Sequence, residues 1–246
     1  MVGVQFQGLI AIVDRFFVLL QTLVGDGALI PCFGIPRRLG NQLRGAQQGF
    51  EVHTAFVDTG GVDPAGRFCL EGDEQVEAYE ALVSQADRAV ADYPDSAGAW
   101  IWNGIIKSSY AGVKGGLGAL GLVKDARTAL EAAMEIDDLA LQGSAYTSLG
   151  TLYYQVHGWP VGFGSDKKAV ELLQKALEVN PDGIDPNYFY ADYLLQKKEY
   201  EQAEKYLLKA QRAEPRPDRP VADAGRQQEI LAALSLTREK LHRSGS

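Results

Sequence analysis

Few residues in this sequence have the types and spacing that catalysis or cofactor binding requires. Gly116, Gly118 and Gly121 satisfy the dinucleotide fingerprint G-x-G-x-x-G, but that fingerprint binds a pyrophosphate only between a strand and a helix of a βαβ unit. Here a helical pattern precedes Gly116. We therefore interpret this segment as an interhelical loop, flexible or closely packed, and predict no nucleotide or other cofactor.

A histidine at position 157 is the next candidate. It lies in a segment rich in Gly, Pro and aromatic residues, with no Cys, Glu or second His at ligand spacing. We expect a solvated loop histidine that binds no metal. Trp159 and Phe163 beside it are expected to pack the segment onto the rest of the protein.

Acidic residues also cluster near position 135, where they resemble a paired-carboxylate site. Glu131 and Glu135 are four residues apart and are expected to share a solvated helix face, while Asp137 and Asp138 end that helix. No Ser, His and acid set has a recognisable nucleophile context, and no glycine-rich loop ends in Lys followed by Ser or Thr. The sequence therefore predicts a protein that is not an enzyme.

Composition excludes other classes of function. The chain has 246 residues, 46% of them hydrophobic, and a net charge of -8 with its basic residues dispersed among acids. Nucleic acid is not an expected partner, because phosphate binding needs clustered Lys and Arg. No apolar run reaches the length of a membrane-spanning helix, so no stable membrane span is predicted.

Two zones of different composition divide the chain at about residue 73. Residues 1–73 lack lysine and have no sustained helical period, so their fold is left unassigned; upstream sequence translated with the protein is one alternative. Residues 16–24 form an apolar stretch that suits an export signal, an anchor or a short buried helix. In a lipoprotein, Cys32 would follow the signal, although Pro31 occupies a position that normally holds a small residue. Cys69 is the other cysteine, and both precede the helical zone at 74–243.

An internal repeat is visible in the helical zone. Four positions recur at a constant offset of 34 residues: Ala169, Leu173, Ala176 and Pro181 correspond to Ala203, Leu207, Ala210 and Pro215. An earlier copy keeps the same internal spacing and ends in Asp in place of Pro: Ala126, Leu130, Ala133 and Asp138. Small alanines let paired helices approach, leucine fills the gap between hairpins, and proline stops the helix.

The helices that precede these segments share a second pattern. Leu149 and Gly150 lie between Tyr146 and Tyr153, and Gly104 and Ala191 stand at the equivalent places of the other two copies. Together these motifs resemble the tetratricopeptide-repeat family over about residues 75–243. The resemblance implies an all-α fold in which antiparallel helix hairpins stack as a short right-handed solenoid, with a solvating end helix at about 221–241.

Two segments depart from the short loops of that family, namely residues 112–121 and 157–164. With these two segments, and with residues 143–146 and 180–190, the chain looks most like exported bacterial repeat proteins. It is more distantly similar to the T-component of TRAP-type solute transporters. This resemblance implies a periplasmic or cell-envelope location, with the cytoplasm as the alternative, and a ligand-related accessory role.

In this family the first helix of each hairpin lines the concave surface that holds a partner. Carried onto this sequence, the partner-binding positions are Trp102, Ile105, Thr147, Thr151, Tyr154, Tyr188 and Asp192. The lining is apolar, hydroxylated and aromatic, and it lacks the Lys, Asn and Arg residues that clamp a terminal carboxylate, so an acidic tail is not expected. In the alternative interpretation, Trp102 and Tyr154 pack against the next helix.

Three functions are thus under consideration. The first is a non-enzymatic scaffold that binds a protein or peptide in the concave face. The second is an exported accessory protein that binds a small or apolar ligand. The third is an enzyme contained in residues 1–72, which polar clusters in that zone would favour.

Overall fold

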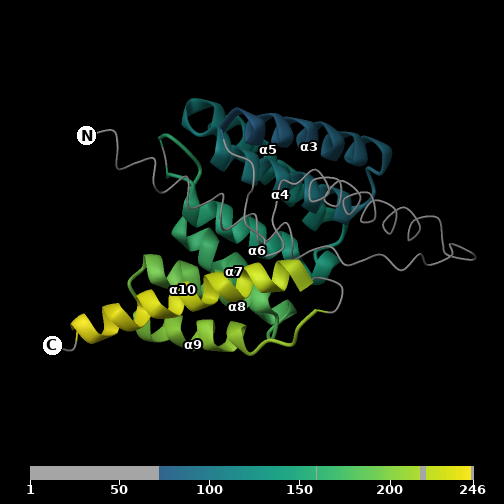
Figure 1. The fold of residues 1–246 in the computed structure, drawn as a ribbon. Coiled ribbons are helices and arrows are strands. Elements are labelled where there is room, and N and C mark those ends of the chain that lie inside the picture. Colours follow the sequence, from purple (N-terminus) through teal and green to yellow (C-terminus); the bar gives the residue numbers. More distant parts are fainter. Residues whose placement is uncertain (1–71, 159, 217–219, 245–246) are drawn as a thin grey trace, which may run out of the picture.

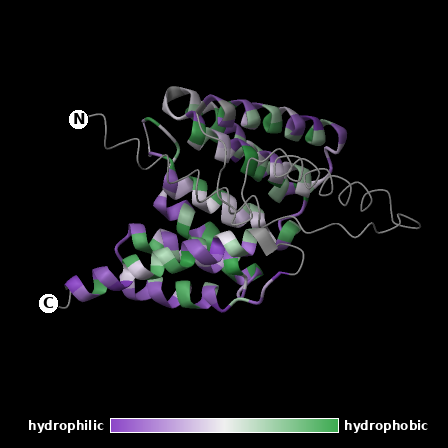
Figure 2. Cartoon of the chain, viewed as in Figure 1, coloured by the Kyte–Doolittle hydropathy of each residue, from purple (hydrophilic) through white to green (hydrophobic). Residues whose placement is uncertain are grey.

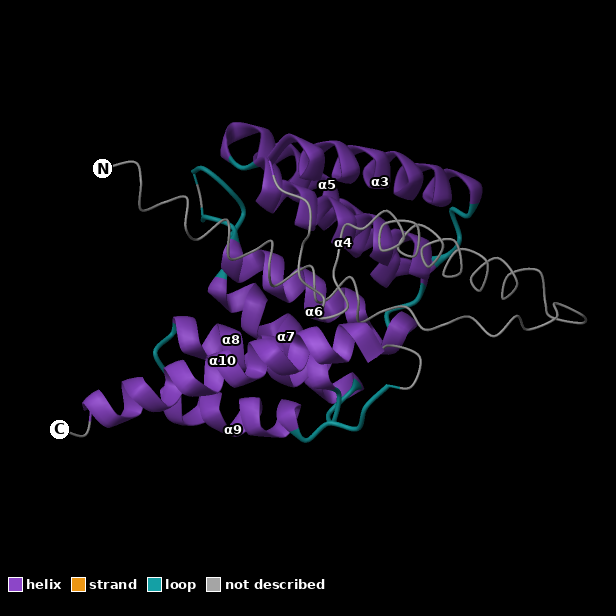
Figure 3. Cartoon of the chain, viewed as in Figure 1, coloured by secondary structure: helices purple, strands orange, loops and turns teal. Residues whose placement is uncertain are grey.

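The computed structural model describes residues 72–158, 160–216 and 220–244, and within these ranges the secondary structure is entirely helical (Figure 3). The helices are α3 (Gly72–Asp92), α4 (Ala97–Lys114), α5 (Gly116–Ile136), α6 (Ala140–Gln155), α7 (Asp166–Val179), α8 (Ile184–Gln196), α9 (Tyr200–Gln211) and α10 (Pro220–Ser244). The predicted all-α class is confirmed. Residues 1–71, with the apolar stretch 16–24 and both cysteines, lie outside the described residues.

Consecutive helices pair into three hairpins, α4 with α5, α6 with α7, and α8 with α9, and these are the most extensive contacts in the structure. Helix α3 packs on α4, and α10 packs on α9 and α8. Figure 1 shows α3 and the first hairpin at one end of the stack, and α9 and α10 at the other. Neighbouring hairpins contact each other in sequence order, which is the arrangement of a helical repeat stack.

The repeat pattern found in the sequence forms the contact surfaces inside the hairpins. All nine of its Ala and Leu side chains are fully buried: Ala126, Leu130, Ala133, Ala169, Leu173, Ala176, Ala203, Leu207 and Ala210. A Cβ atom on Gly104 would lie 2.6 Å from Leu130 Cγ, and one on Gly150 would lie 2.9 Å from Leu173 Cγ. Each glycine therefore admits the leucine of the paired helix, at a distance that a side chain would prevent.

Residues 112–121 are not the interhelical loop that the sequence suggested. Helix α4 continues to Lys114, α5 begins at Gly116, and Gly115 alone connects them. Gly115 and Gly116 have φ values of 61° and 58°, a left-handed conformation that glycine adopts at little cost. The apparent insertion therefore lengthens both helices of the first hairpin, and its glycines were misread as loop residues.

Asp137 and Asp138 end α5, as predicted, and each accepts a hydrogen bond. The Asp137 Oδ1 atom accepts from the backbone N–H of Leu139 at 3.0 Å, and Asp138 Oδ2 accepts from Tyr146 Oη at 2.6 Å. The hydrogen bond to Asp138, with burial, raises the pKa of Tyr146 to about 12. The contact ties the end of the first hairpin to α6, where the other two repeats have a proline.

Helix α10 (Pro220–Ser244) spans the segment 221–241, where an end helix was expected. Its buried positions follow a helical period, at Ala222, Arg226, Ile230, Leu234 and Thr237. Figure 2 shows hydrophilic and hydrophobic residues alternating along α9 and α10, as expected for helices with one face in the core and one in solvent. No helix among the described residues combines the length and apolar character needed to cross a membrane.

The close approach of the hairpin helices predicts the effect of a single methyl group. Gly150→Ala should lower the free energy of unfolding by about 1–3 kcal/mol, because the added carbon meets both Leu173 and the Ala169 carbonyl oxygen. Gly121→Ala is the matched control, since a Cβ atom there meets nothing within 4 Å. It should raise stability by about 0.5–1 kcal/mol through helix propensity. Urea denaturation measures both, and equal effects would contradict the assigned contact.

Candidate functional site

The seven residues predicted to line a concave binding face are mostly inaccessible. Trp102, Ile105 and Tyr188 belong to the hydrophobic core, with 5% exposure or less. Thr147 and Thr151 are buried on α6, where the Thr151 hydroxyl donates to the Thr147 carbonyl oxygen at 2.8 Å. The hydroxyl of Thr151 is therefore satisfied within its own helix and does not depend on a ligand.

Tyr154 and Asp192 are the two predicted residues that the structure joins. The Tyr154 Oη atom donates to Asp192 Oδ2 at 2.6 Å, and Gln155 Nε2 lies 3.5 Å from the same oxygen. Tyr154 also packs edge-on against Tyr193, with ring centroids 5.6 Å apart. Asp192 is buried, while Tyr154 and Gln155 are half-buried. These contacts link the first helices of the second and third hairpins and leave an accessible edge at Tyr154.

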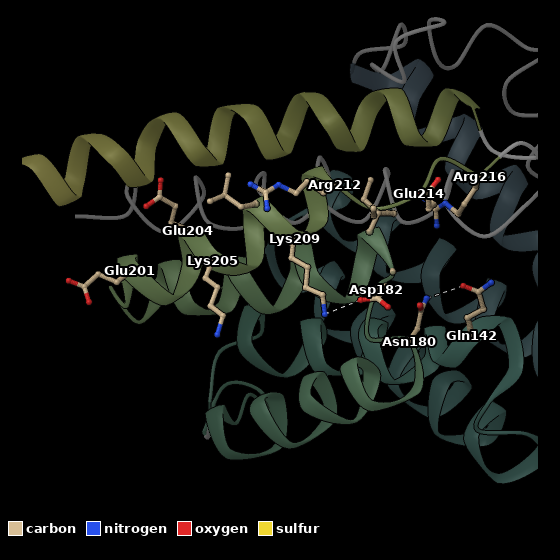
Figure 4. Close-up of a pocket in the computed structure, with 14 residues that line it drawn as sticks. Gln142, Asn180, Asp182, Glu201, Glu204, Lys205, Lys209, Arg212, Glu214 and Arg216 are labelled. Atoms are coloured by element: carbon tan, nitrogen blue, oxygen red, sulfur yellow. Dashed lines mark hydrogen bonds and ion pairs between the residues drawn. The ribbon is translucent and has the colours of Figure 1, made fainter.

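A broad open groove lies elsewhere, beside α9 (Figure 4). Its volume is about 880 Å³, and its walls come from α9, the turn between α7 and α8, the start of α6 and the segment after α9. Ile184, Leu208 and Ala213 provide a short apolar floor. This groove was not predicted from the sequence, because most of its residues lie on the second helix α9, in turns and in the segment after α9.

Charges of both signs surround the floor. Lys209 Nζ lies 3.2 Å from Asp182 Oδ1, and Glu204 accepts from Arg238 Nε at 2.8 Å. In the part of the chain that the structure describes, Lys205 and Arg212 have no carboxylate at ion-pair distance. Glu201 and Glu214 likewise have no cation there. Two positive and two negative groups of the groove are thus available to an incoming molecule.

One wall of the groove is built by an unusual backbone. Leu141, Gln142 and Gly143 have φ values of 49°, 57° and 74°, which break the first turn of α6. A left-handed conformation is costly for the two non-glycine residues, roughly 1 kcal/mol or more each. This backbone conformation places Gln142 beside the end of α7. There Gln142 Oε1 accepts a hydrogen bond from Asn180 Nδ2 at 2.9 Å.

Arg216, another residue of the groove lining, belongs to a largely buried cluster of ions. Arg216 donates to Asp185 at 2.9 Å and to Asp223 at 2.8 Å. Arg226 on α10 is fully buried; it donates to Asp185 at 2.9 Å and to Glu229. The cluster joins α8, α10 and the segment that follows α9.

The guanidinium of Arg226 is also held between aromatic rings. Its central carbon lies 4.4 Å from the ring centroid of Tyr188 and 4.5 Å from that of Phe189. Burial alone would lower the pKa of Arg226. The negative charges of Glu229 and Asp185 more than offset this effect, so the pKa lies above its usual value. For Arg216, burial likewise lowers the pKa and the charges of Asp185 and Asp223 raise it. The net pKa of Arg216 is also above its usual value. Both arginines therefore stay charged in the interior.

The histidine at position 157 and the acidic residues near position 135 were not predicted to be functional sites. His157 is exposed, and Phe163 packs edge-on against Tyr153 with ring centroids 5.5 Å apart; Trp159 lies outside the described residues. Glu135 is exposed, and Glu131 pairs with Arg127 on its own helix face. Among the described residues, no group of three or more His, Cys, Asp or Glu side chains is arranged to hold a metal ion.

These features define a helical repeat stack of the kind that generally serves as a scaffold for protein interactions. Specifically, residues 167–227 match the tetratricopeptide repeat family. The match extends from α7 through α8 and α9 into α10, and so includes most of the groove beside α9. No curated protein matches the sequence. The resemblance to the T-component of TRAP-type transporters is not supported by these comparisons.

The buried cluster predicts how strongly α10 is attached. Arg226→Met should lower the free energy of unfolding by about 3–5 kcal/mol, because Asp185 and Glu229 would lose a buried cation. Arg238→Ala, on the same helix, removes an ion pair whose arginine is 55% exposed. It should cost no more than about 1 kcal/mol. Urea denaturation together with hydrogen exchange along α10 distinguishes these effects, and similar losses in the two variants would contradict the role given to Arg226.

Proposed function

We propose that this protein is a non-enzymatic scaffold that holds a protein partner in the groove beside α9. The observation that carries the proposal is the groove itself, which combines about 880 Å³ of open volume with an apolar floor and unneutralised charges at its rim. Protein interfaces combine a buried apolar centre with a polar rim in the same way. Its position within the matched repeat segment agrees with the general role of such repeats.

The charges indicate what kind of partner fits. An apolar side chain over Leu208 would bury carbon on both partners, and acidic groups would pair with Lys205 and Arg212. Glu201 and Glu214 would repel a uniformly acidic segment and attract basic groups. The favoured partner is therefore a protein segment with apolar residues and charges of both signs. The mixed rim does not favour nucleic acid, whose phosphates need a continuous basic surface.

The concave face around Tyr154 is a second candidate surface. Of the seven residues predicted there, Tyr154 alone is half-buried, and the other six are buried. Gln155, which contacts the same Asp192 oxygen, is also half-buried. A partner on this side would thus contact the accessible parts of Tyr154 and Gln155.

A photo-crosslinking experiment tests the first surface against the second. A benzophenone amino acid is introduced at Leu208, at Tyr154 or at exposed Lys124, and proteins captured from an extract of the source cells are identified by mass spectrometry. We expect a specific partner at position 208 that is absent at position 124. Capture at position 154 alone would indicate that the partner binds at the accessible edge around Tyr154 and not in the groove.

Charge reversal then checks whether the captured partner is recognised by the rim. Lys205→Glu with Arg212→Glu should weaken the purified complex by about tenfold or more, corresponding to about 1.4 kcal/mol. Lys124→Glu with Lys167→Glu changes the net charge equally at exposed positions outside the groove. Isothermal titration calorimetry should give the unaltered affinity for this control. Equal weakening by both pairs would show a nonspecific charge effect and contradict the proposed groove.

A further inference from the structure

The two segments that depart from the repeat pattern meet in space. Residues 112–121 extend the first hairpin, and the segment that begins at His157 connects α6 to α7. Ala111, Gly112, Gly116 and Ala119 from the first hairpin form one side of a small pocket, and Val156 and His157 form another. This pocket shares no residue with the groove beside α9.

The pocket exists because its walls carry very small side chains. Ala111, Gly112 and Ala119 are buried, and a Cβ atom on Gly116 would meet nothing within 4 Å. Its volume is about 50 Å³, which is roughly three to four times the space that one enclosed water requires. Among the described residues of the lining, His157 is the polar one, and the side chains of the others are hydrocarbon.

The connecting segment holds its side of the pocket in a fixed position. Its chain folds back so closely that a Cβ atom on Gly162 would lie 2.4 Å from the His157 carbonyl oxygen. The Gly164 N–H donates to that same oxygen at 2.9 Å, and the Ser165 N–H donates to the Tyr153 carbonyl oxygen at 2.8 Å. Phe163 anchors the loop on Tyr153. Val156 and His157 are therefore kept at the pocket by backbone contacts that only glycine permits.

We infer that this pocket is a binding site for a small uncharged aliphatic ligand of about three to four carbons. The pocket is partly open, and its mainly apolar walls favour an apolar guest of matching size. A charged group would lose part of its hydration there without gaining a counter-ion, which is unfavourable. The exposed imidazole of His157 lies at the edge, where it can form a hydrogen bond with a polar end of the ligand.

Methyl NMR on the full chain tests this inference with 2-methylpropan-1-ol as the probe. The methyl resonances of Ala111, Ala119, Val123 and Val156 should shift saturably as the alcohol is added, while ethylene glycol at equal concentration should leave them unchanged. Ala119→Leu fills the pocket and should weaken probe binding by about tenfold or more. Gly121→Ala, which lies outside the lining, should bind as the original protein does.

A second variant keeps the inference testable if Ala119→Leu does not fold. Val156→Ala enlarges the pocket and should allow a bulkier probe, cyclohexanol, to produce saturable shifts at Ala111 and Val123. Absence of saturation in the original protein would overturn the inference, as would unchanged binding in a folded Ala119→Leu variant. Because the pocket and the groove have separate residues, either result leaves the partner-binding proposal standing on its own test.

Discussion

The separation of the two helices within each hairpin determines how the rest of the stack can form. In the first two hairpins a glycine faces a leucine of the paired helix, and a Cβ atom on that glycine would lie 2.6 Å or 2.9 Å from the leucine Cγ atom. The leucines and the alanines one turn away from them are fully buried. Such contact at backbone distance sets the width of a hairpin, and the width sets the spacing at which the next hairpin packs.

The ends of the stack need a different solution, because a terminal hairpin has an apolar face with no further repeat to cover it. Here α3 covers the first hairpin and α10 covers the last. The covering at α10 is partly ionic, since Arg226 is buried between two aromatic rings and two carboxylates. Arg216 takes part in the same cluster and also lines the groove beside α9. The closure of the stack and the shape of its candidate binding surface therefore share one set of contacts.

The hairpin pattern was predictable because a fixed offset of 34 residues reports directly on packing. The six Ala and Leu positions related by this offset, and the three of the earlier copy that share their internal spacing, are all fully buried, in agreement with the all-α class. Residues 112–121 were misread because glycine usually marks loops, whereas here Gly112, Gly118 and Gly121 lie inside α4 and α5 despite the low helix propensity of glycine. Gly112 is buried, but Gly118 and Gly121 are exposed, so burial does not account for their helical conformation.

The candidate sites were harder to predict than the fold. The positions assigned to the concave face have the right spacing, but spacing does not determine how much of a helix face its neighbours cover, and Trp102 and Tyr188 are in the core. The groove depends on the left-handed turn at Gln142 and on the connection after α9, neither of which has a periodic pattern. Arg226 did carry a signal, because it lies midway between Ala222 and Ile230 in the buried stripe of α10. The expectation of a solvating end helix at 221–241 included no role for Arg226.

The ionic attachment of α10 fixes the position of this helix along its neighbours, in addition to stabilising it. A helix held by apolar side chains alone can shift along its partner by one turn and exchange one aliphatic contact for a similar one. Arg226 has no equivalent one turn away, because Ala222 and Ile230 occupy those positions. Sliding α10 would leave a guanidinium and its carboxylates unmatched inside the protein. The cluster thus favours one axial register of α10 over shifted registers in which the apolar contacts would be similar.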